Sequence, residues 1–478
     1  MVKLTPKLNP NGWDEMFSNK GVRNSYRKVL QTLQSLNHEN LNQKQRQAAD
    51  FFMNQGITFT VYSDDNQGIE RIFPFDIIPR IITQNDWNEV ESGIKQRLKA
   101  LNLFLEDIYN GQEIVKEGII PAALISSCPH YIQEVHGIKV PHDIHIHIAG
   151  IDLIRGAKGE FYVLEDNLRC PSGVSYMLEN REITKRIFPE MFTSNDVSMV
   201  ANYPMIFHNI LVSLSPRNIS NPNVVLLTPG IYNSAYYEHT FLARQMGIPL
   251  VEGRDLVVNN SKVYMKTTSG HQQVDVIYRR LDDEYLDPMV FKPDSALGVP
   301  GLIIAYKMGN VALVNAVGNG VADDKAVYAY VPDMIKYYLN EVPILKNVPT
   351  YQMGNIEERE LVFADMENMV IKETNQSGGY GVVMGNKATE KELEDVKIAI
   401  LNNPRNFIAQ PIIQLSTVPC LIDGELKLRH VDLRPYALCG PNGIEIVPGG
   451  LTRVALTEGS LVVNSSQGGG SKDTWIVK

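Results

Sequence analysis

The sequence has little cysteine, and its cysteines do not form the patterns typical of metal or redox sites. Among 478 residues there are four, Cys128, Cys170, Cys420 and Cys439, and no two of them make a Cys-x-x-Cys pair. This spacing excludes the common zinc and dithiol motifs, so we expect reduced cysteines inside the core. Disulfides are not needed for stability, because a chain of this length forms about three ordinary domains or two large ones.

Long apolar runs and dense basic blocks are also missing. No stretch approaches the roughly 18 consecutive apolar residues of a membrane-spanning helix, and the N-terminus lacks the apolar segment of a secretory signal. Lys and Arg number 45 against 54 Asp and Glu, a formal net charge of −9. These features predict a globular cytoplasmic protein whose main partner is neither nucleic acid nor a membrane surface.

Hydrophobic periodicity predicts a mainly helical cap over residues 1–120. The strongest helix begins near Thr83 or Asn85, repeats apolar residues at steps of three and four, and stops at Gly111. A shorter helix with the same period lies around residues 26–36, and a strand-like ITFTVY follows it. Because the polar residues of this region form no cluster, we interpret the cap as structural.

A hairpin is predicted in the next segment, residues 121–220, where the spacing of apolar residues changes from the helical period of about 3.6 to every second residue. HDIHIHIAGIDLIR and FYVLEDN have the pattern of two strands, and KGE between them has the composition of a turn. His145 and His147 alternate with isoleucines on the first strand. Such a pair can chelate a metal from one strand face, but alternation of this kind is equally typical of an ordinary strand.

Two further segments are predicted downstream. In residues 221–320, strand VVLL, a TPG loop, a helix ended by Gly247 and strand IPLV form a Rossmann-like unit without a dinucleotide fingerprint. The glycine-rich tract 292–321 is expected to be a loop-rich domain boundary. Residues 321–478 are expected to contain a helix from Asp323 to Tyr338, followed by the strands MVIKE, VVMG and FIAQPII.

The second hairpin strand carries residues suited to a hard cation. Glu165 and Asn167 are two apart in VLEDN, so they share one strand face, whereas Asp166 points to the other. Asp152 on the preceding strand is close enough in a hairpin to add a third oxygen. Such oxygens suit Mg²⁺, although a hydrogen-bonded strand end explains the same local pattern.

Another chemically suggestive pattern lies at Lys372, which ends the apolar strand MVIKE. A charged side chain in such a strand needs a partner, and a phosphate is one. Five residues later comes the segment Ser377 to Gly381, whose last four positions hold three glycines, which allows backbone N–H groups to surround an anion. The segment lacks the Gly-Lys-Ser/Thr ending of a P-loop. An ordinary glycine turn is the alternative interpretation.

Taken together, VLEDN, ADDK, VIKE with SGGYG, and IAQP resemble the motifs of ATP-grasp ligases. The order is permuted, because the acidic strand precedes the lysines and the glycine loop. The chain therefore resembles more closely the circularly permuted ATP-grasp group that is similar to glutathionylspermidine synthase, in an uncharacterised bacterial branch. The resemblance implies an α+β fold with an α/β pre-ATP-grasp unit, a metal-binding hairpin and an ATP-binding lobe with a glycine flap and a C-terminal tail.

The resemblance also implies roles for individual residues. Asp152, Glu165 and Asn167 match Mg²⁺ ligands, Lys325 and Lys372 match the nucleotide lysines, and Gln410 matches the adenine hinge. The flap residues are Gly378, Gly379, Tyr380 and Gly381. The arginines that are candidates to hold the substrate carboxylate or the transferred phosphoryl group are Arg155, Arg169, Arg434 and Arg453.

The implied cofactors are ATP and Mg²⁺, and the implied reaction joins a small-molecule or peptide carboxylate to an amine through an acyl phosphate. The amidase domain of glutathionylspermidine synthase is absent. Companion proteins of α-helical and transglutaminase-like type are implied by resemblance alone. Two alternatives stay open, a nucleotide-binding regulatory or scaffold protein without turnover and an ATP-dependent kinase. The apparent completeness of the motif set favours the ligase.

Overall fold

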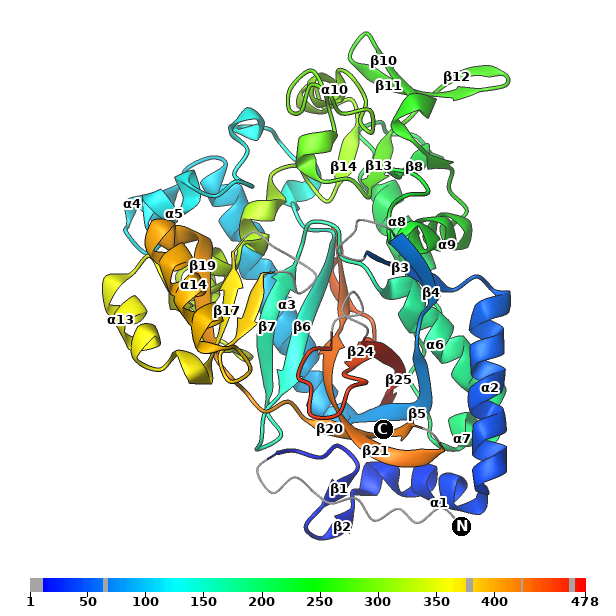
Figure 1. Cartoon of the computed structure of the whole chain (residues 1–478). Helices are drawn as coiled ribbons and strands as arrows, with labels where there is room; N and C mark the ends of the chain where they lie inside the picture. Colours follow the sequence, from blue (N-terminus) through cyan, green and yellow to red (C-terminus); the bar gives the residue numbers. More distant parts are fainter. Residues whose placement is uncertain (1–11, 63–67, 375–380, 423, 464–468) are drawn as a thin grey trace.

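A large central sheet joins the two ends of the chain (Figure 1). The computed structural model describes residues 12–62, 68–374, 381–422, 424–463 and 469–478. The main path of the sheet runs β15 (Lys346–Asn347), β7 (Phe161–Asn167), β6 (Ile148–Arg155), β21 (Glu425–Arg434), β24 (Leu451–Val454), β25 (Gly470–Val477) and β5 (Phe75–Thr83). Off this path, β20 (Thr417–Ile422) pairs with β21, and β22 (Tyr436–Gly440) pairs with β6 and with β23 (Gly443–Ile446).

The N-terminal region is only partly the helical cap that its periodicity predicts. The expected helices are present as α1 (Arg27–Ser35) and α3 (Gln84–Ile108), and the side chain of Thr83 caps α3 by accepting from the N–H of Asp86. However, β5 is a strand of the central sheet and pairs in parallel with β25. Its sequence, FDIIPRIIT, is buried at every position but the last, so it cannot remain in an outer cap.

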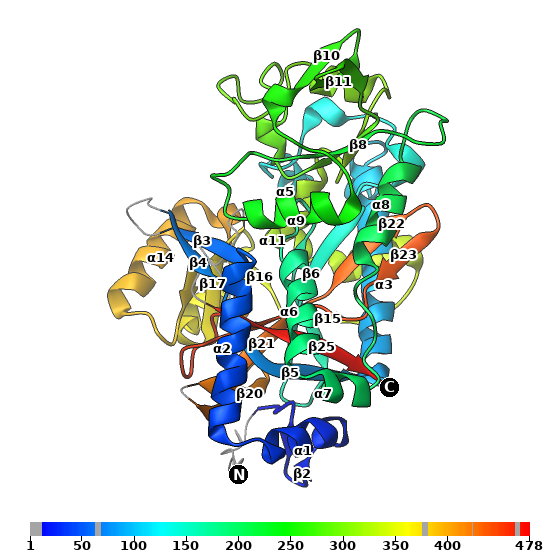
Figure 2. The same ribbon diagram turned by 90° about the vertical axis from the view of Figure 1, so that its right-hand side faces the viewer.

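The other elements of the N-terminal region surround this sheet. The long helix α2 (His38–Asn54) runs along the outside of the molecule beside α6 (Val174–Ile187), as Figure 2 shows. The remaining short elements are β1 (Phe17–Ser18), β2 (Gly21–Val22), β3 (Thr58–Tyr62), β4 (Gly68–Ile72), α4 (Glu113–Lys116), α5 (Ala122–Ser126), α7 (Pro189–Ser194) and α8 (Tyr203–Ser213). None of the helices in the described ranges is both long and apolar enough to cross a membrane.

The predicted hairpin is present as β6 and β7, but it begins later than the alternating pattern suggests. The N–H groups of His145 and Ile146 donate to the side-chain oxygen of Asn102, and those of His147 and Ile148 donate to that of Asn315. Because these N–H groups are bonded to side chains, the regular strand begins at Ile148. Both histidines therefore precede the strand that was expected to carry them.

The Rossmann-like unit forms a four-stranded parallel sheet at one end of the molecule. Its elements are β8 (Val224–Leu227), α9 (Tyr236–Met246), β9 (Leu250–Val251), β13 (Val276–Arg279) and β14 (Ala312–Val314). Gly247 ends α9 in the left-handed region at φ +67°, as predicted. The tract 292–321 is not merely a loop-rich boundary, because it holds α10 (Leu302–Lys307) and the edge strand β14, which completes this sheet.

A small lobe lies beside β7 and has a hydrophobic core of its own. Its elements are β16 (Tyr351–Gln352), α13 (Ile356–Ala364), β17 (Met369–Glu373), β18 (Val382–Met384), α14 (Glu390–Asn402) and β19 (Phe407–Pro411). The three strands predicted here are confirmed as β17, β18 and β19.

The single helix expected from Asp323 to Tyr338 is instead broken into α11 (Lys325–Tyr328), α12 (Val331–Met334) and a π-helical turn from Ile335 to Leu339. Pro332 stands at the start of α12, where its missing N–H favours a new helix over continuation of the old one.

An outlying three-stranded sheet projects from the Rossmann-like unit (Figure 1). It consists of β10 (Leu256–Asn259), β11 (Lys262–Thr267) and β12 (Gly270–Gln273).

All four cysteines are free, as the sequence predicts. Three of them are buried and Cys170 is half-buried.

Candidate active site

The hairpin places Asp152 and Glu165 on one face of the central sheet. Asp152 on β6 lies directly opposite Glu165 on β7, and the two carboxyl groups are within hydrogen-bond reach of each other. Asn167 lies opposite Gly150 in the same register. Asp166 points the other way, where Arg97 of α3 donates two hydrogen bonds of 2.6 Å to its carboxylate. The predicted alternation along this strand is confirmed.

Asp152 is held by two arginines from neighbouring strands. Arg434 donates to both carboxylate oxygens at 2.5 and 2.8 Å, and Nη2 of Arg453 donates to Oδ2 at 2.6 Å. Burial alone would raise the pKa of Asp152, but the two guanidinium groups outweigh it and hold that pKa well below its usual range. Asp152 is therefore an anion whose two oxygens are already bonded, and its role as a third metal ligand stays a prediction.

Lys372 projects from β17 of the small lobe toward the same carboxylates. Its Nζ donates to Oε1 of Gln410 on β19 at 2.7 Å. Burial lowers the pKa of Lys372 to about 8, with the nearby charge of Lys325 acting in the same direction, while Glu165 and Asp152 oppose the shift. Lys372 on β17 is therefore within electrostatic reach of charged residues on β6, β7 and α11. Each was a candidate from the sequence.

Lys325 begins α11 just after the buried Asp324, which caps that helix by accepting from the N–H groups of Ala326 and Val327. The N–H of Lys325 donates to the carbonyl of Thr374, at the end of β17, over 3.5 Å. The flap residues Gly378, Gly379 and Tyr380 lie outside the described residues. Gly381 is described and has a φ of +66°, in the left-handed region that favours glycine.

Gln410, the expected hinge residue, joins two parts of the small lobe. Its amide nitrogen donates to the hydroxyl of Thr350 at 2.9 Å, while its amide oxygen accepts from Lys372. The side chain is buried, and it fixes the ammonium group of the lysine on the face of the lobe that looks toward the hairpin. Sequence reasoning missed Thr350, because a lone threonine between strands has no distinguishing local pattern.

Arg169 lies at the carboxyl end of β7, two residues beyond Asn167. Its Nε donates to Asp323 at 2.7 Å and its Nη1 reaches Asp282 at 3.5 Å. The side chain is 18% exposed, so part of the guanidinium group is accessible next to the proposed metal ligands. Its assignment as a substrate-binding residue stays a prediction, as does that of Arg453.

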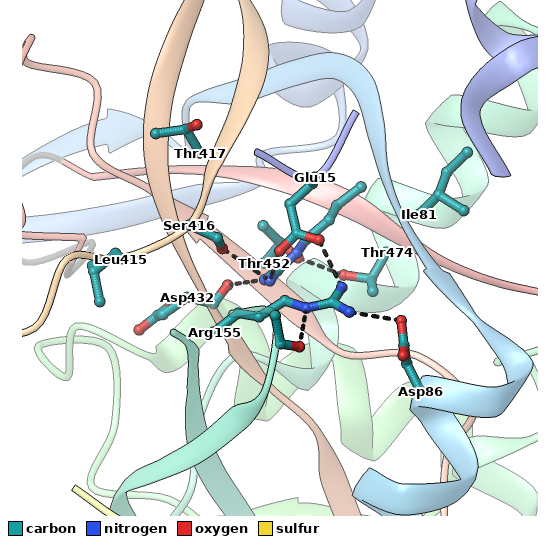
Figure 3. Close-up of polar contacts among 12 residues, drawn as sticks. Glu15, Ile81, Asp86, Arg155, Leu415, Ser416, Thr417, Asp432, Thr452 and Thr474 are labelled. Carbon is teal, nitrogen blue, oxygen red and sulfur yellow. Dashed lines mark hydrogen bonds and ion pairs between the residues drawn. The ribbon is translucent and has the colours of Figure 1, made fainter. Parts of the chain in front are cut away.

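Arg155 lies in a different environment from Arg434 and Arg453, and its contacts do not favour its predicted role at the site. Figure 3 shows its guanidinium group between Glu15 and Asp86, to which it donates at 2.8 Å each. Nε donates to the carbonyl of Gly159 at 2.7 Å. Each of its three nitrogens therefore has a protein acceptor at the turn end of the hairpin. This gives Arg155 a structural role in fixing the N-terminal segment.

The residues on the hairpin fit a magnesium ion. Because Arg434 and Arg453 already offset the charge of Asp152, the fit depends mainly on Glu165 and Asn167. Nδ2 of Asn167 is buried without a hydrogen-bond partner, so turning the amide oxygen toward a cation breaks no bond at that atom. Two carboxylates and an amide are oxygen donors of the kind that Mg²⁺ prefers.

The two histidines have different surroundings. His145 bonds to Glu106 at 3.0 Å through Nε2, while burial lowers the pKa of His147 to about 3 and keeps its ring neutral. Within the described parts of the chain, no three His, Cys, Asp or Glu side chains gather as metal ligands. The proposed magnesium set has only two such residues, because its third member is Asn167.

Comparisons with known proteins show what the chain as a whole resembles. The sequence pattern of the family described as circularly permuted ATP-grasp type 2 matches residues 79–455. An uncharacterized protein of Synechocystis sp. is 53% identical over 469 residues, which cover 98% of this chain and 97% of the relative.

A protein of Frankia alni with the provisional name glutamate–cysteine ligase 2-3 is 41% identical over 99% of this chain, which spans 54% of that protein. Among solved structures, a glutathione synthetase-like effector from Globodera pallida in its apo form matches with a TM-score of 0.60. The match covers 92% of this chain and 98% of the effector at 10% identity, so it shows the shared fold alone.

Proposed function

We propose that this chain, which belongs to the circularly permuted ATP-grasp type 2 family, is an ATP-dependent ligase that joins a carboxylate to an amine through an acyl phosphate. Family membership supports an ATP-dependent ligase in general. The observation that carries the finer proposal is that Lys372 lies within electrostatic reach of Lys325 and of the carboxylates of Glu165 and Asp152. Cations that bind phosphate and oxygens that bind Mg²⁺ then face each other across one site.

Each group has a distinct task in this reaction. Lys372 and Lys325 bind phosphate oxygens and offset the negative charge that develops during transfer. Glu165 and Asn167, with Asp152, would hold Mg²⁺, which supplies further charge neutralisation and orients the phosphates. Arg169 is placed to bind the substrate carboxylate beside this metal set.

The proposed reaction has two steps. An oxygen of the substrate carboxylate attacks the γ-phosphorus of ATP, the bond to the β,γ-bridging oxygen breaks, and ADP leaves. The amine nitrogen then attacks the acyl carbon, loses a proton and expels inorganic phosphate, which leaves an amide. Enclosing the intermediate between the small lobe and the hairpin would protect the acyl phosphate from water.

The substrates remain defined only by chemical class, a carboxylate and an amine. The name of the Frankia relative supports the ligase class, but this chain matches only about half of that protein, so the name does not identify the substrates. A peptide-related substrate and helical or transglutaminase-like companion proteins are the partners that the family resemblance favours.

A trapping experiment tests the reaction class. Protein, Mg-ATP and a pool of small carboxylates and peptides are incubated with hydroxylamine, a strong nucleophile that converts an acyl phosphate into a hydroxamate. We expect ADP, inorganic phosphate and a hydroxamate. AMP would contradict the mechanism. A stable phosphorylated hydroxyl product without hydroxamate would identify a kinase, and nucleotide binding without any product would favour the regulatory alternative.

A further inference from the structure

Arg405 connects the small lobe to two parts of the chain that lie outside it. The residue sits just before β19, and its side chain is 22% exposed. Its nearest acceptor within the lobe is the hydroxyl of Thr374, which its Nη1 reaches at 3.1 Å. Its other acceptors belong to the segment that begins α11 and to the N-terminal region.

The contact with α11 involves a buried carboxylate. Nη2 of Arg405 donates to Oδ2 of Asp324 at 3.0 Å, and Nη1 lies 3.4 Å from Oδ1. Asp324 is 1% exposed, so it needs a cationic partner, and it also caps the helix on which Lys325 stands. Arg405 therefore stabilises the residue that orients the first turn of α11.

The contact with the N-terminal region reaches α5 and the residue that follows it. Nε of Arg405 donates to the hydroxyl of Ser127 at 3.0 Å, and Nη2 donates to the carbonyl of Leu124 at 3.2 Å. The sequence indicates no role for this segment. It lies against the junction where the carbonyl of Thr374 accepts from the N–H of Lys325.

We propose that Arg405 is a positioning residue that locks the small lobe against the α5 segment and so fixes the spacing of Lys325 and Lys372 for nucleotide binding. The inference rests on the proposed function, because it assigns both lysines to the nucleotide. Lys372 lies two residues before Thr374, and Lys325 is bonded to Thr374 directly. If the small lobe swings away from α5, the bonds to Ser127 and Leu124 are lost and the two lysines separate.

The test measures ATP binding and hydrogen exchange in the full chain. Arg405→Ala should weaken ATP affinity about tenfold, measured by calorimetric titration. In the wild-type protein, ATP should also slow amide exchange over residues 122–131, a segment with no assigned nucleotide contact. Arg405→Ala should abolish that protection. Arg405→Lys keeps the positive charge but lacks the several N–H donors of the guanidinium group, so it should restore part of the protection.

Two controls separate the possible outcomes. Arg359→Ala removes an arginine of the same lobe whose bond is to the carbonyl of Met353, and it should change neither measurement. Lys372→Ala tests the proposed function itself. If ATP affinity falls in Lys372→Ala but both the affinity and the ATP-dependent protection are unchanged in Arg405→Ala, the lock is overturned while the proposed function stands.

Wild-type protein that binds no ATP would overturn both proposals. Because Asp324 would lose its partner, Arg405→Ala is a risk to folding. Should it fail to fold, Arg405→Lys together with Ser127→Ala carries the test. Wild-type protection over 122–131 in both of these variants would overturn the lock, whereas reduced protection in both supports it.

Discussion

Two buried clusters of arginine and carboxylate lie on β6, only three residues apart, and they serve different purposes. At Asp152 the partners are Arg434 and Arg453 from adjacent strands of the same sheet. At Arg155 the partners are Glu15 and Asp86, from the N-terminal segment and the first turn of α3. A buried ion pair on a strand is therefore not in itself a sign of catalysis, and the surroundings must decide.

The surroundings differ in one respect that matters. The guanidinium group of Arg155 lies against the rings of Trp13 and Phe161, at 4.7 and 4.8 Å from their centroids, and Glu15 also accepts a hydrogen bond from Arg80. Burial would raise the pKa of Glu15, but the two arginines lower it to about 2. The cluster at Asp152 instead borders Glu165 and Lys372, groups suited to a metal ion and a phosphate.

The largest effect should follow from Glu165→Gln. If Glu165 is a magnesium ligand as proposed, this substitution removes a ligand at the point where charge develops, so ATP turnover should fall about a hundredfold to a thousandfold. The matched variant is Asp166→Asn, which changes the next residue on the opposite strand face. It should lower the stability of the fold by weakening the two hydrogen bonds that Arg97 donates to the carboxylate of Asp166, while the folded protein keeps most of its turnover. Equal loss of turnover in both variants would refute the metal assignment.

A second large effect should come from the other cluster and should concern stability. Arg155→Met leaves Glu15 buried with one cationic partner fewer, which should lower the free energy of unfolding by about 3 kcal/mol. Denaturant unfolding measures this change. Turnover per folded molecule should stay near the wild-type value, and a selective loss of turnover without destabilisation would return Arg155 to the active site.

The same contrast explains what could be predicted from the sequence. Local signals were sufficient for α3 with its Thr83 cap, for the phase of the strand ending at Asn167, and for Gly247 at the end of α9. They failed where a partner is distant. Glu15 is 140 residues from Arg155, and Arg405 is 81 residues from Asp324, so no local pattern could reveal either contact.

The remaining error at β5 has the same origin, since its partner β25 lies at the other end of the chain. The candidate site was easier to predict, because Lys372 and Glu165 each stand out within their own strand.

A smaller effect is expected from Lys372→Ala, which removes one charge-assisted contact to phosphate. ATP affinity should fall at least about tenfold while the protein stays folded, as calorimetric titration can measure. The comparison variant is Lys346→Ala, on the exposed edge of β15, which should leave affinity unchanged. Unaltered ATP binding in Lys372→Ala would place the nucleotide elsewhere and remove the functional distinction between the two clusters.

The smallest expected effect is the uptake of a fraction of a proton when ATP binds, and it follows from the burial of Lys372. Its pKa is about 8 in the free protein against an ordinary value of 10.5, so at pH 8.5 roughly three quarters of the side chains are neutral. Because phosphate stabilises the charged form, ATP binding at this pH should take up somewhat less than one proton, and affinity should weaken as pH rises above about 8. The unfolded chain binds more protons than the folded chain between these two pKa values, so this group makes stability rise with pH over the same range.

Calorimetric titrations of ATP binding in two buffers of different ionisation enthalpy at pH 8.5 measure the proton uptake, which should nearly vanish at pH 6.5 and in Lys372→Met. The same uptake in Lys372→Met would assign the proton to another group.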